Sequence, residues 1–143
     1  MSERNLAVIN AEGLILGRMA SIVAKRLLKG ERIEIVNAEG AVVSGKRRMV
    51  IKERKEFLNV GGPTKGPFHY RKPNAIVRRT IRGMLPHRKS RGRNAYGRLK
   101  VHIGVPRELE GLKKESLEGA RVERLKGRYV TVAEIAKNVG WKV

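Results

Sequence analysis

The chain has 143 residues, which suffices for one hydrophobic core and leaves little material for a second. Its formal charge of +20 comes from 33 Lys and Arg against 13 acidic residues, and self-repulsion of this size favours a polyanionic partner. The apolar runs are only a few residues long, which excludes a membrane span of roughly 20 apolar residues, and no secretory signal pattern is visible. We therefore expect a cytoplasmic protein that binds phosphate groups and has no membrane partner.

Cys, Asp and Gln do not occur, so every acidic residue is a glutamate. Without Cys, thiolate nucleophiles and zinc–thiolate sites are excluded, and a magnesium site would have to be built from glutamates alone. His69, His87 and His102 are too scattered for a metal site, and we interpret them as solvated or bound to phosphate. We expect no catalysis, no cofactor, no metal and no small-molecule substrate.

The first part of the chain has the pattern of a strand, a helix and a second strand. Residues 6–9 form a short apolar run followed by a glycine turn, and apolar residues recur at helical spacing from Leu16 to Leu27 before Gly30. Residues 33–36 and 41–43 are further short apolar runs. This order is typical of a parallel crossover unit.

The middle of the chain alternates between helical and irregular patterns. A helix is predicted from about Lys46 to Phe57, and residues 59–72 are predicted to form a loop because of their glycines and prolines. Pro73 favours a helix start, and Val77, Thr80, Ile81, Met84 and Leu85 form the apolar face of that helix. Residues 86–97 are predicted to be a basic loop, and residues 99–103 alternate as a strand does.

The composition changes after Pro106, where glutamates return among the basic residues. We expect residues 1–106 to form a single α/β core domain and residues 107–143 to form a charged, solvated C-terminal extension. Thr131 and Glu134 are spaced as a capping box at the start of a final short helix. Trp141, close to the end of that helix, is expected to pack against the core rather than stack on a base.

The strongest functional signal is an acid-free stretch, residues 57–107, which contains thirteen Lys and Arg, all three His and no acidic residue. A solvated protein surface usually mixes charges of both signs, whereas contact with a phosphate backbone requires their segregation. The sparse aromatic residues do not form a base-stacking strand motif, and no helix-turn-helix pair, zinc finger or basic zipper is recognised. Shape-based binding of a folded RNA fits best. The residues expected to contact RNA are Lys46, Arg47, Arg48, Arg71, Lys72, Arg78, Arg79, Arg82, His87, Arg88, Lys89, Arg91, Arg93, Asn94, Arg98 and Lys100.

Two other functions have to be weighed against RNA binding. Residues 40–46 match the spacing of a phosphate loop, G-x-x-x-x-G-K, which would indicate a nucleotide-dependent enzyme. However, Arg47 stands where a Ser or Thr would bind Mg²⁺, and the residues between the glycines have the pattern of a strand. A general DNA-compacting protein is the second alternative, because the same charge would bind duplex DNA.

Three segments together resemble the universal large-subunit ribosomal protein thirteen family. They are AEGLILGRMASIVAK (residues 11–25), NAEGAVVSGKR (residues 37–47), and IRGMLP (residues 81–86) with RLKV (residues 98–101). The resemblance implies a three-layer α/β/α fold on a small, mainly parallel sheet, and a structural, non-catalytic role. Its implied partners are large-subunit (23S-type) rRNA and neighbouring large-subunit ribosomal proteins. The histidine-rich ending of the bacterial members is absent, and in this respect the chain resembles the archaeal or eukaryotic branch.

Overall fold

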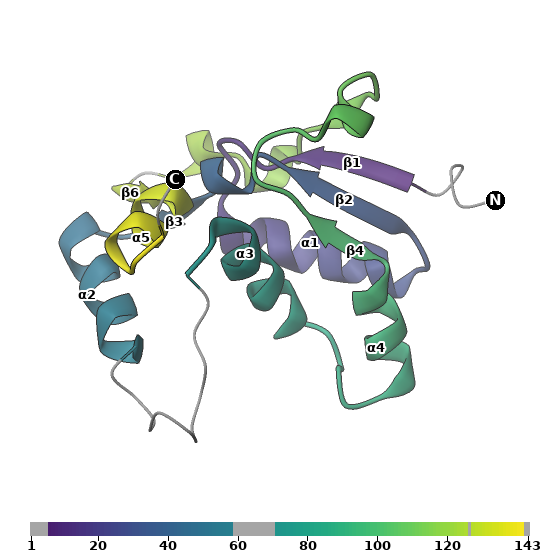
Figure 1. The fold of residues 1–143 in the computed structure, drawn as a ribbon, viewed down its shortest axis with the longest axis horizontal. Helices are drawn as coiled ribbons and strands as arrows, with labels where there is room; N and C mark the ends of the chain where they lie inside the picture. The colour runs from purple at the N-terminus through teal and green to yellow at the C-terminus, as the bar shows by residue number, and fades with distance from the viewer. Residues whose placement is uncertain (1–5, 59–70, 126, 142–143) are drawn as a thin grey trace.

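The fold is organised around a four-stranded sheet with the order β4-β2-β1-β5, in which every neighbouring pair of strands is parallel (Figure 1). This computed structural model describes residues 6–58, 71–125 and 127–141. The strands of the central sheet are β1 (Leu6–Asn10), β2 (Arg32–Val36), β4 (Leu99–Val101) and β5 (Lys114–Glu115), and β3 (Val42–Ser44) pairs antiparallel with β6 (Tyr129–Thr131) in a second sheet. The helices are α1 (Leu16–Leu28), α2 (Arg47–Leu58), α3 (Pro73–Arg82), α4 (Ser90–Gly97) and α5 (Val132–Asn138). The predicted loop at residues 59–72 lies largely outside the described residues.

The main core lies between the sheet and the helices α1, α3 and α4. Because side chains alternate along a strand, each strand sends every second residue to this side, and these residues are Ala7, Ile9, Ile33, Ile35, Leu99 and Val101. The helical stripe predicted for α1 is buried against them through Leu16, Met19, Ala20, Val23 and Leu27. The predicted β1-α1-β2 crossover, with its parallel strands, is therefore confirmed.

The opposite face of the sheet carries a smaller apolar cluster. Val8 and Val36 point to this side and pack with Leu109, which belongs to the short 3-10 helix η3 (Arg107–Leu109). In Figure 1 the segment that contains η3 runs above the sheet, on the side away from α1 and α4. The chain is thus a three-layer α/β/α protein with a small, mainly parallel sheet, as predicted.

The predicted basic loop at residues 86–97 is wrong, because residues 90–97 form helix α4. Its buried face consists of Gly92 and Ala95. A Cβ atom built on Gly92 would lie 2.0 Å from the carbonyl oxygen of Pro86, so the helix crosses the preceding turn at backbone contact distance. Small residues that allow such close packing leave no stripe of large apolar side chains in the sequence, which is why the periodicity did not reveal this helix.

Helix α3 is shorter than predicted, and its expected apolar face is partly exposed. The helix ends at Arg82; Ile81 is completely buried, whereas Met84 is 44% exposed in the following turn. The expectation that Met84 belongs to the core is therefore wrong. Its exposure follows from the end of the helix, after which residue 84 no longer continues the stripe.

Replacement of Ile81 by alanine is expected to destabilise the protein by about 2–5 kcal/mol, because it removes buried methyl groups and leaves a cavity. Met84→Ala, which shortens an exposed side chain in the turn that follows the helix, is expected to change stability by less than about 0.5 kcal/mol. Urea unfolding of the two variants measures the difference. Equal losses would show that residue 84 is packed.

Residues 107–143 contribute to the same structure as the preceding part of the chain. Strand β5 extends the central sheet beside β1, and β6 pairs with β3. Helix α5 buries Val132, Ile135 and Ala136 in the main core. The predicted capping bond is present, since the backbone N–H of Glu134 donates to Oγ1 of Thr131 at 3.2 Å. Trp141 packs against the main core, as expected. A domain boundary near residue 106 stays a prediction.

One arginine connects the end of α1 to strand β5. The Arg26 guanidinium donates from Nε to both carboxylate oxygens of Glu31, at 3.1 and 3.0 Å, and from Nη1 to Glu115 at 2.9 Å. These hydrogen bonds lower the pKa of the Glu31 carboxyl group and raise the pKa of Arg26. Arg26 therefore joins two segments that lie 89 residues apart in the chain.

Replacement of Arg26 by methionine is expected to lower the free energy of unfolding by about 1 kcal/mol at pH 7, since the pair with Glu31 is partly exposed. Because the Glu31 pKa is depressed in the folded protein, its contribution is present above the ordinary value near 4.5 and is lost as the pH falls below it. The difference between wild type and Arg26→Met should therefore shrink between pH 7 and pH 3 in urea titrations. Arg121→Met is the control, because the ion pair of Arg121 is formed with Glu123, only two positions away in the chain, and is exposed. Equal losses in the two variants would contradict a special role for Arg26.

Candidate nucleic-acid interface

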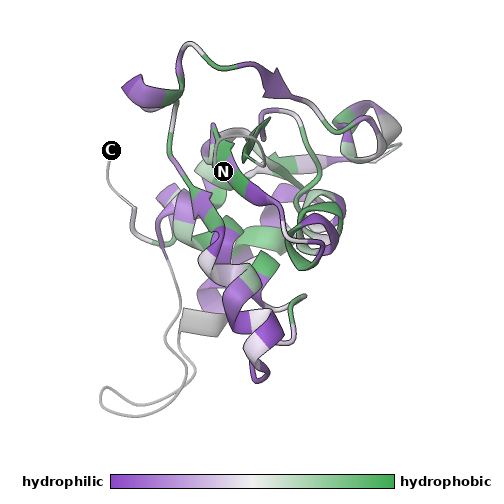
Figure 2. Ribbon diagram, turned by 90° about the vertical axis from the view of Figure 1, so that its right-hand side faces the viewer, coloured by the Kyte–Doolittle hydropathy of each residue, from purple (hydrophilic) through white to green (hydrophobic). Residues whose placement is uncertain are grey.

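The largest group of predicted RNA-contacting residues lies on α3, on α4 and in the turn between them. Arg79 on α3 is exposed, and Arg78 and Arg82 are half-buried on the same helix. The exposed members of the turn and α4 are Arg88, Lys89, Arg91, Arg93 and Asn94, and His87 is half-buried. We call this set the α3–α4 surface. In Figure 2 the α4 end of the molecule is predominantly hydrophilic.

The position of α4 is fixed from within the protein, which leaves its outer side chains available. Ala95 is buried in the main core, and the Lys89 backbone N–H donates to the Pro86 carbonyl at 2.9 Å. Arg93 donates from Nη1 to the Arg88 carbonyl at 2.8 Å, which closes the first turn of the helix. The cations therefore project from a rigid element and not from a flexible loop. A preorganised surface loses less conformational entropy when it binds.

Helices α3 and α4 are also connected by a cation–π contact. The guanidinium carbon of Arg78 lies 4.0 Å from the centre of the Tyr96 ring. Tyr96, half-buried, packs against the main core, and Arg78 is half-buried as well. The pattern of the sequence did not indicate this contact, because a single aromatic residue 18 positions from its partner gives no local signal.

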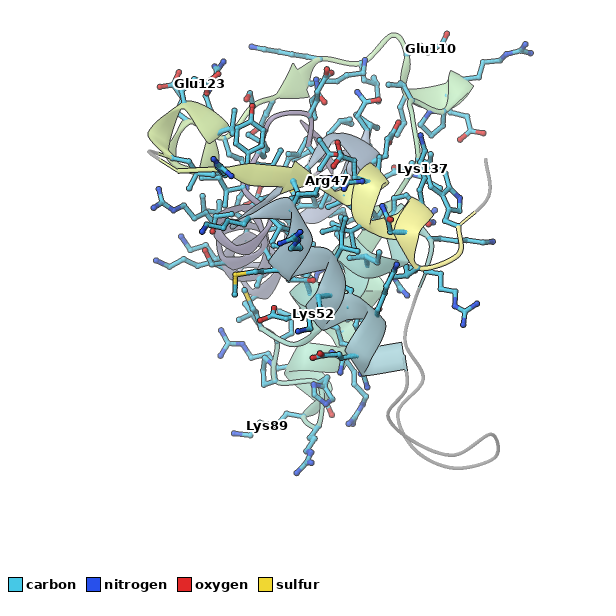
Figure 3. The ribbon with its side chains drawn as sticks, turned by 90° about the vertical axis from the view of Figure 1, so that its left-hand side faces the viewer. Arg47, Lys52, Lys89, Glu110, Glu123 and Lys137 are labelled. Carbon is cyan, nitrogen blue, oxygen red and sulfur yellow. The ribbon has the colours of Figure 1, made fainter. Side chains whose placement is uncertain are left out.

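A second basic group lies at the start of α2. Lys46, Arg47 and Arg48 are exposed, and a shallow cavity of about 530 Å³ is lined by Arg47, Arg48, Ile51, Lys52, Lys55, Glu56 and Asn138. Arg47 is paired with Glu134 of α5 at 3.1 Å. Figure 3 shows Arg47 and Lys52 on α2, well separated from Lys89 at the lower tip of the molecule. Most of the predicted residues thus lie on two separate surfaces.

Arg71 and Lys72 are exposed immediately before α3. Arg71 lies beside Gly140, which follows α5, since its Nη1 atom would be 3.3 Å from a Cβ atom built there. Arg71 therefore lies between the start of α3 and the end of α5.

Three of the predicted residues have surroundings that the sequence did not indicate. Arg98 donates from Nη2 to the Leu27 carbonyl at 2.6 Å and so caps the end of α1. Lys100 points away from the helices, because its neighbours Leu99 and Val101 face the main core. His87 has a buried Nδ1 atom without a hydrogen-bond partner among the described residues.

The interpretation of His102 as solvated or bound to phosphate is not what the structure shows. Its Nε2 atom lies 2.9 Å from the Glu34 carboxylate, and both side chains are partly buried on the sheet face opposite the main helices. His102 therefore has an internal partner. His69 lies outside the described residues.

Two of the exposed glutamates lie far from the tip of the α3–α4 surface. Figure 3 shows Glu110 and Glu123 at the end of the molecule opposite Lys89. Among the ion pairs between described side chains, none involves a cation of the α3–α4 surface. An uncompensated cluster of cations on a rigid surface produces a local positive potential that attracts a polyanion.

The phosphate-loop match at residues 40–46 has the structure of a strand and a turn. Its backbone N–H groups have partners within the protein: Val42 donates to the Leu14 carbonyl at 2.8 Å, and Gly45 donates to the Arg128 carbonyl at 2.8 Å. A phosphate loop uses such groups to surround the nucleotide phosphates. The interpretation of this segment as a strand is confirmed by β3.

A metal-binding cluster and a membrane-spanning helix are both absent from the described residues. Within residues 6–58, 71–125 and 127–141 there is no group of three or more His or Glu side chains that could hold a metal ion. In the same part of the chain, no helix is long and apolar enough to span a membrane.

Comparison with known proteins identifies the family. Residues 4–108 match the family model described as Ribosomal protein L13. A protein of Archaeoglobus fulgidus named Large ribosomal subunit protein uL13 is 49% identical over 140 residues, which cover 96% of this chain and 90% of that protein. Proteins of the same name from Methanococcoides burtonii and Saccharolobus solfataricus are 46% and 45% identical and cover 96% and 97% of this chain, with 99% and 95% of their own lengths. These matches extend beyond residue 108 and agree with the archaeal type of ending. The chain belongs to the ribosomal protein L13 family.

Proposed function

We propose that this protein is a structural constituent of the large ribosomal subunit and binds large-subunit rRNA through the α3–α4 surface. The observation that carries the proposal is the row of exposed cations on α3, α4 and their connecting turn, which have no carboxylate partners among the described residues. Each Lys or Arg that neutralises a phosphate releases condensed counterions, and this release supplies most of the affinity. The contacts position the RNA without reading its sequence.

The basic group on α2 is proposed as a second RNA contact. It is exposed and lies apart from α4, so one molecule has room to touch two stretches of RNA. Neighbouring large-subunit proteins are the other proposed partners, and the ribosome places the protein in the cytoplasm. The role is not catalytic. Neither nucleotide-dependent catalysis nor general DNA compaction is supported by the family.

The proposal is tested by measuring the affinity of the protein for large-subunit rRNA and for duplex DNA between 50 and 300 mM salt. We expect tighter binding to the structured rRNA at every salt concentration and a steep decrease of affinity with salt. The protein should also sediment with large subunits and remain bound through a moderate salt wash. Equal affinity for duplex DNA at about 150 mM salt would favour the DNA-compacting alternative.

A further inference from the structure

The contact between Arg78 and Tyr96 places a guanidinium over an aromatic ring, and no other cation of the α3–α4 surface is held in this way among the described residues. The guanidinium carbon lies over the ring, 4.0 Å from its centre, which is within the range of a cation–π contact. A contact of this kind uses the charge and leaves the N–H donors of the guanidinium free for another acceptor. Among the described residues, none accepts a hydrogen bond from Arg78 or pairs with it as an acid.

We propose that Tyr96 is a positioning residue that holds the Arg78 guanidinium open for two-point binding of a single RNA phosphate. The inference rests on the proposed function and assigns to this surface a residue that carries no charge of its own. A planar guanidinium matches a phosphate through two parallel hydrogen bonds. The ring fixes the plane in which these two bonds are offered.

Both partners of this contact are half-buried. A fully exposed arginine must give up the freedom of several rotatable bonds when it binds, at a cost of up to about 2 kcal/mol. Arg78 has already lost part of this freedom against Tyr96, which is itself held by the main core. Its partial removal from water also strengthens a charge-assisted hydrogen bond to phosphate. Arg79, one position further along α3, is exposed and lies over no aromatic ring among the described residues.

The ring face, and not the hydroxyl group, carries this role. The Tyr96 hydroxyl has no hydrogen-bond partner among the described residues. Phenylalanine would present a similar π face, whereas leucine would retain apolar packing against the core and lose the stack. The two substitutions therefore separate orientation of Arg78 from packing of α4.

The test is a double-mutant cycle for binding of large-subunit rRNA, with Tyr96→Phe, Tyr96→Leu, Arg78→Met and the Tyr96→Leu/Arg78→Met double variant. We expect Tyr96→Phe to bind as wild type does and Tyr96→Leu to bind roughly 3- to 10-fold more weakly. Arg78→Met should bind roughly 10-fold more weakly and lower the slope of log affinity against log salt by about 0.7–0.9, as one lost phosphate contact requires. In the Arg78→Met background, Tyr96→Leu should have no further effect.

Thermal unfolding of each variant and a second tyrosine substitution provide the controls. Tyr129 on β6 is half-exposed and has no stacked arginine among the described residues, so Tyr129→Leu should bind RNA as wild type does. Unchanged binding by Tyr96→Leu would overturn the proposal. The proposal would also fail if Tyr96→Leu still lowered the RNA affinity in the Arg78→Met background, because Tyr96 would then act through packing or by direct stacking on a base.

Two further outcomes distinguish the proposed phosphate contact of Arg78 from the proposed function of the whole protein. If Arg78→Met weakens binding without a change in the salt slope, the guanidinium contacts a base edge, and its assignment to a phosphate is wrong. If wild type itself shows no preference for large-subunit rRNA over duplex DNA, the proposed function fails before the cycle is measured. The two failures are therefore distinguishable.

Discussion

Simultaneous replacement of Arg88, Lys89, Arg91 and Arg93 by glutamine is expected to weaken rRNA binding by roughly 100- to 1,000-fold near 150 mM salt. These four side chains are exposed on α4 and its preceding turn. If each neutralises one phosphate, the slope of log affinity against log salt should fall by about 3. Filter binding at five or more salt concentrations gives the affinity and the slope together.

A matched variant separates this effect from the loss of net charge. Four other exposed cations lie outside the acid-free stretch: Arg18, Lys25, Lys29 and Lys113. Their replacement by glutamine lowers the net charge by the same amount. We expect this control to lower the affinity less than 10-fold, because charges remote from the RNA act only through the screened overall field. If the two variants lose the same affinity and slope, net charge alone drives binding and α4 has no special role.

Folding should be preserved in the α4 variant, since none of the four side chains supports the core. The helix is held by Ala95 and Gly92, and the hydrogen bond that Arg93 makes to the Arg88 carbonyl is exposed. Far-UV circular dichroism and the unfolding temperature check this point. A variant that binds weakly and unfolds normally locates the defect in the interface.

The sequence revealed those elements whose buried faces consist of large apolar side chains. Helix α1 was predicted because Leu16, Met19, Val23 and Leu27 recur at helical spacing and are all buried. Helix α4 was missed because Gly92 and Ala95 form its buried face. Strand β5 was missed because its two residues, Lys114 and Glu115, are polar, and its pairing depends on the edge of β1. Local patterns do not contain this kind of tertiary information.

In the candidate site, too, some features are visible in the local sequence and others depend on tertiary contacts. A long stretch without acidic residues led to the prediction of an RNA-binding surface, because charge segregation is visible in composition alone. The role of an individual arginine depends on segments that are distant in sequence. Arg98 caps the end of α1 at Leu27, 71 residues away, and Arg78 stacks on Tyr96. Neither contact follows from spacing or charge.

Gly92→Ala is expected to be the most damaging single substitution in the α3–α4 region. A Cβ atom on residue 92 would lie 2.0 Å from the Pro86 carbonyl oxygen, 2.2 Å from its carbon and 2.8 Å from the backbone nitrogen of His87. All three are backbone atoms, so no side-chain rotation relieves the overlap, and α4 has to move away from the turn. We expect a loss of about 3 kcal/mol, at the upper end of overpacking effects. In a domain of this size the loss corresponds to an unfolding temperature lower by roughly 6–12 °C.

Gly97→Ala provides the control on the same helix. A Cβ atom there has no neighbour within 4 Å, so the substitution should change stability by less than about 0.5 kcal/mol. Below its unfolding temperature, Gly92→Ala should also bind rRNA more weakly than Gly97→Ala, because the displaced α4 carries its cations with it. Calorimetry and RNA titration of the two variants measure both effects. If Gly92→Ala unfolds and binds as Gly97→Ala does, α4 is not held against Pro86, and the rigid presentation of its arginines is wrong.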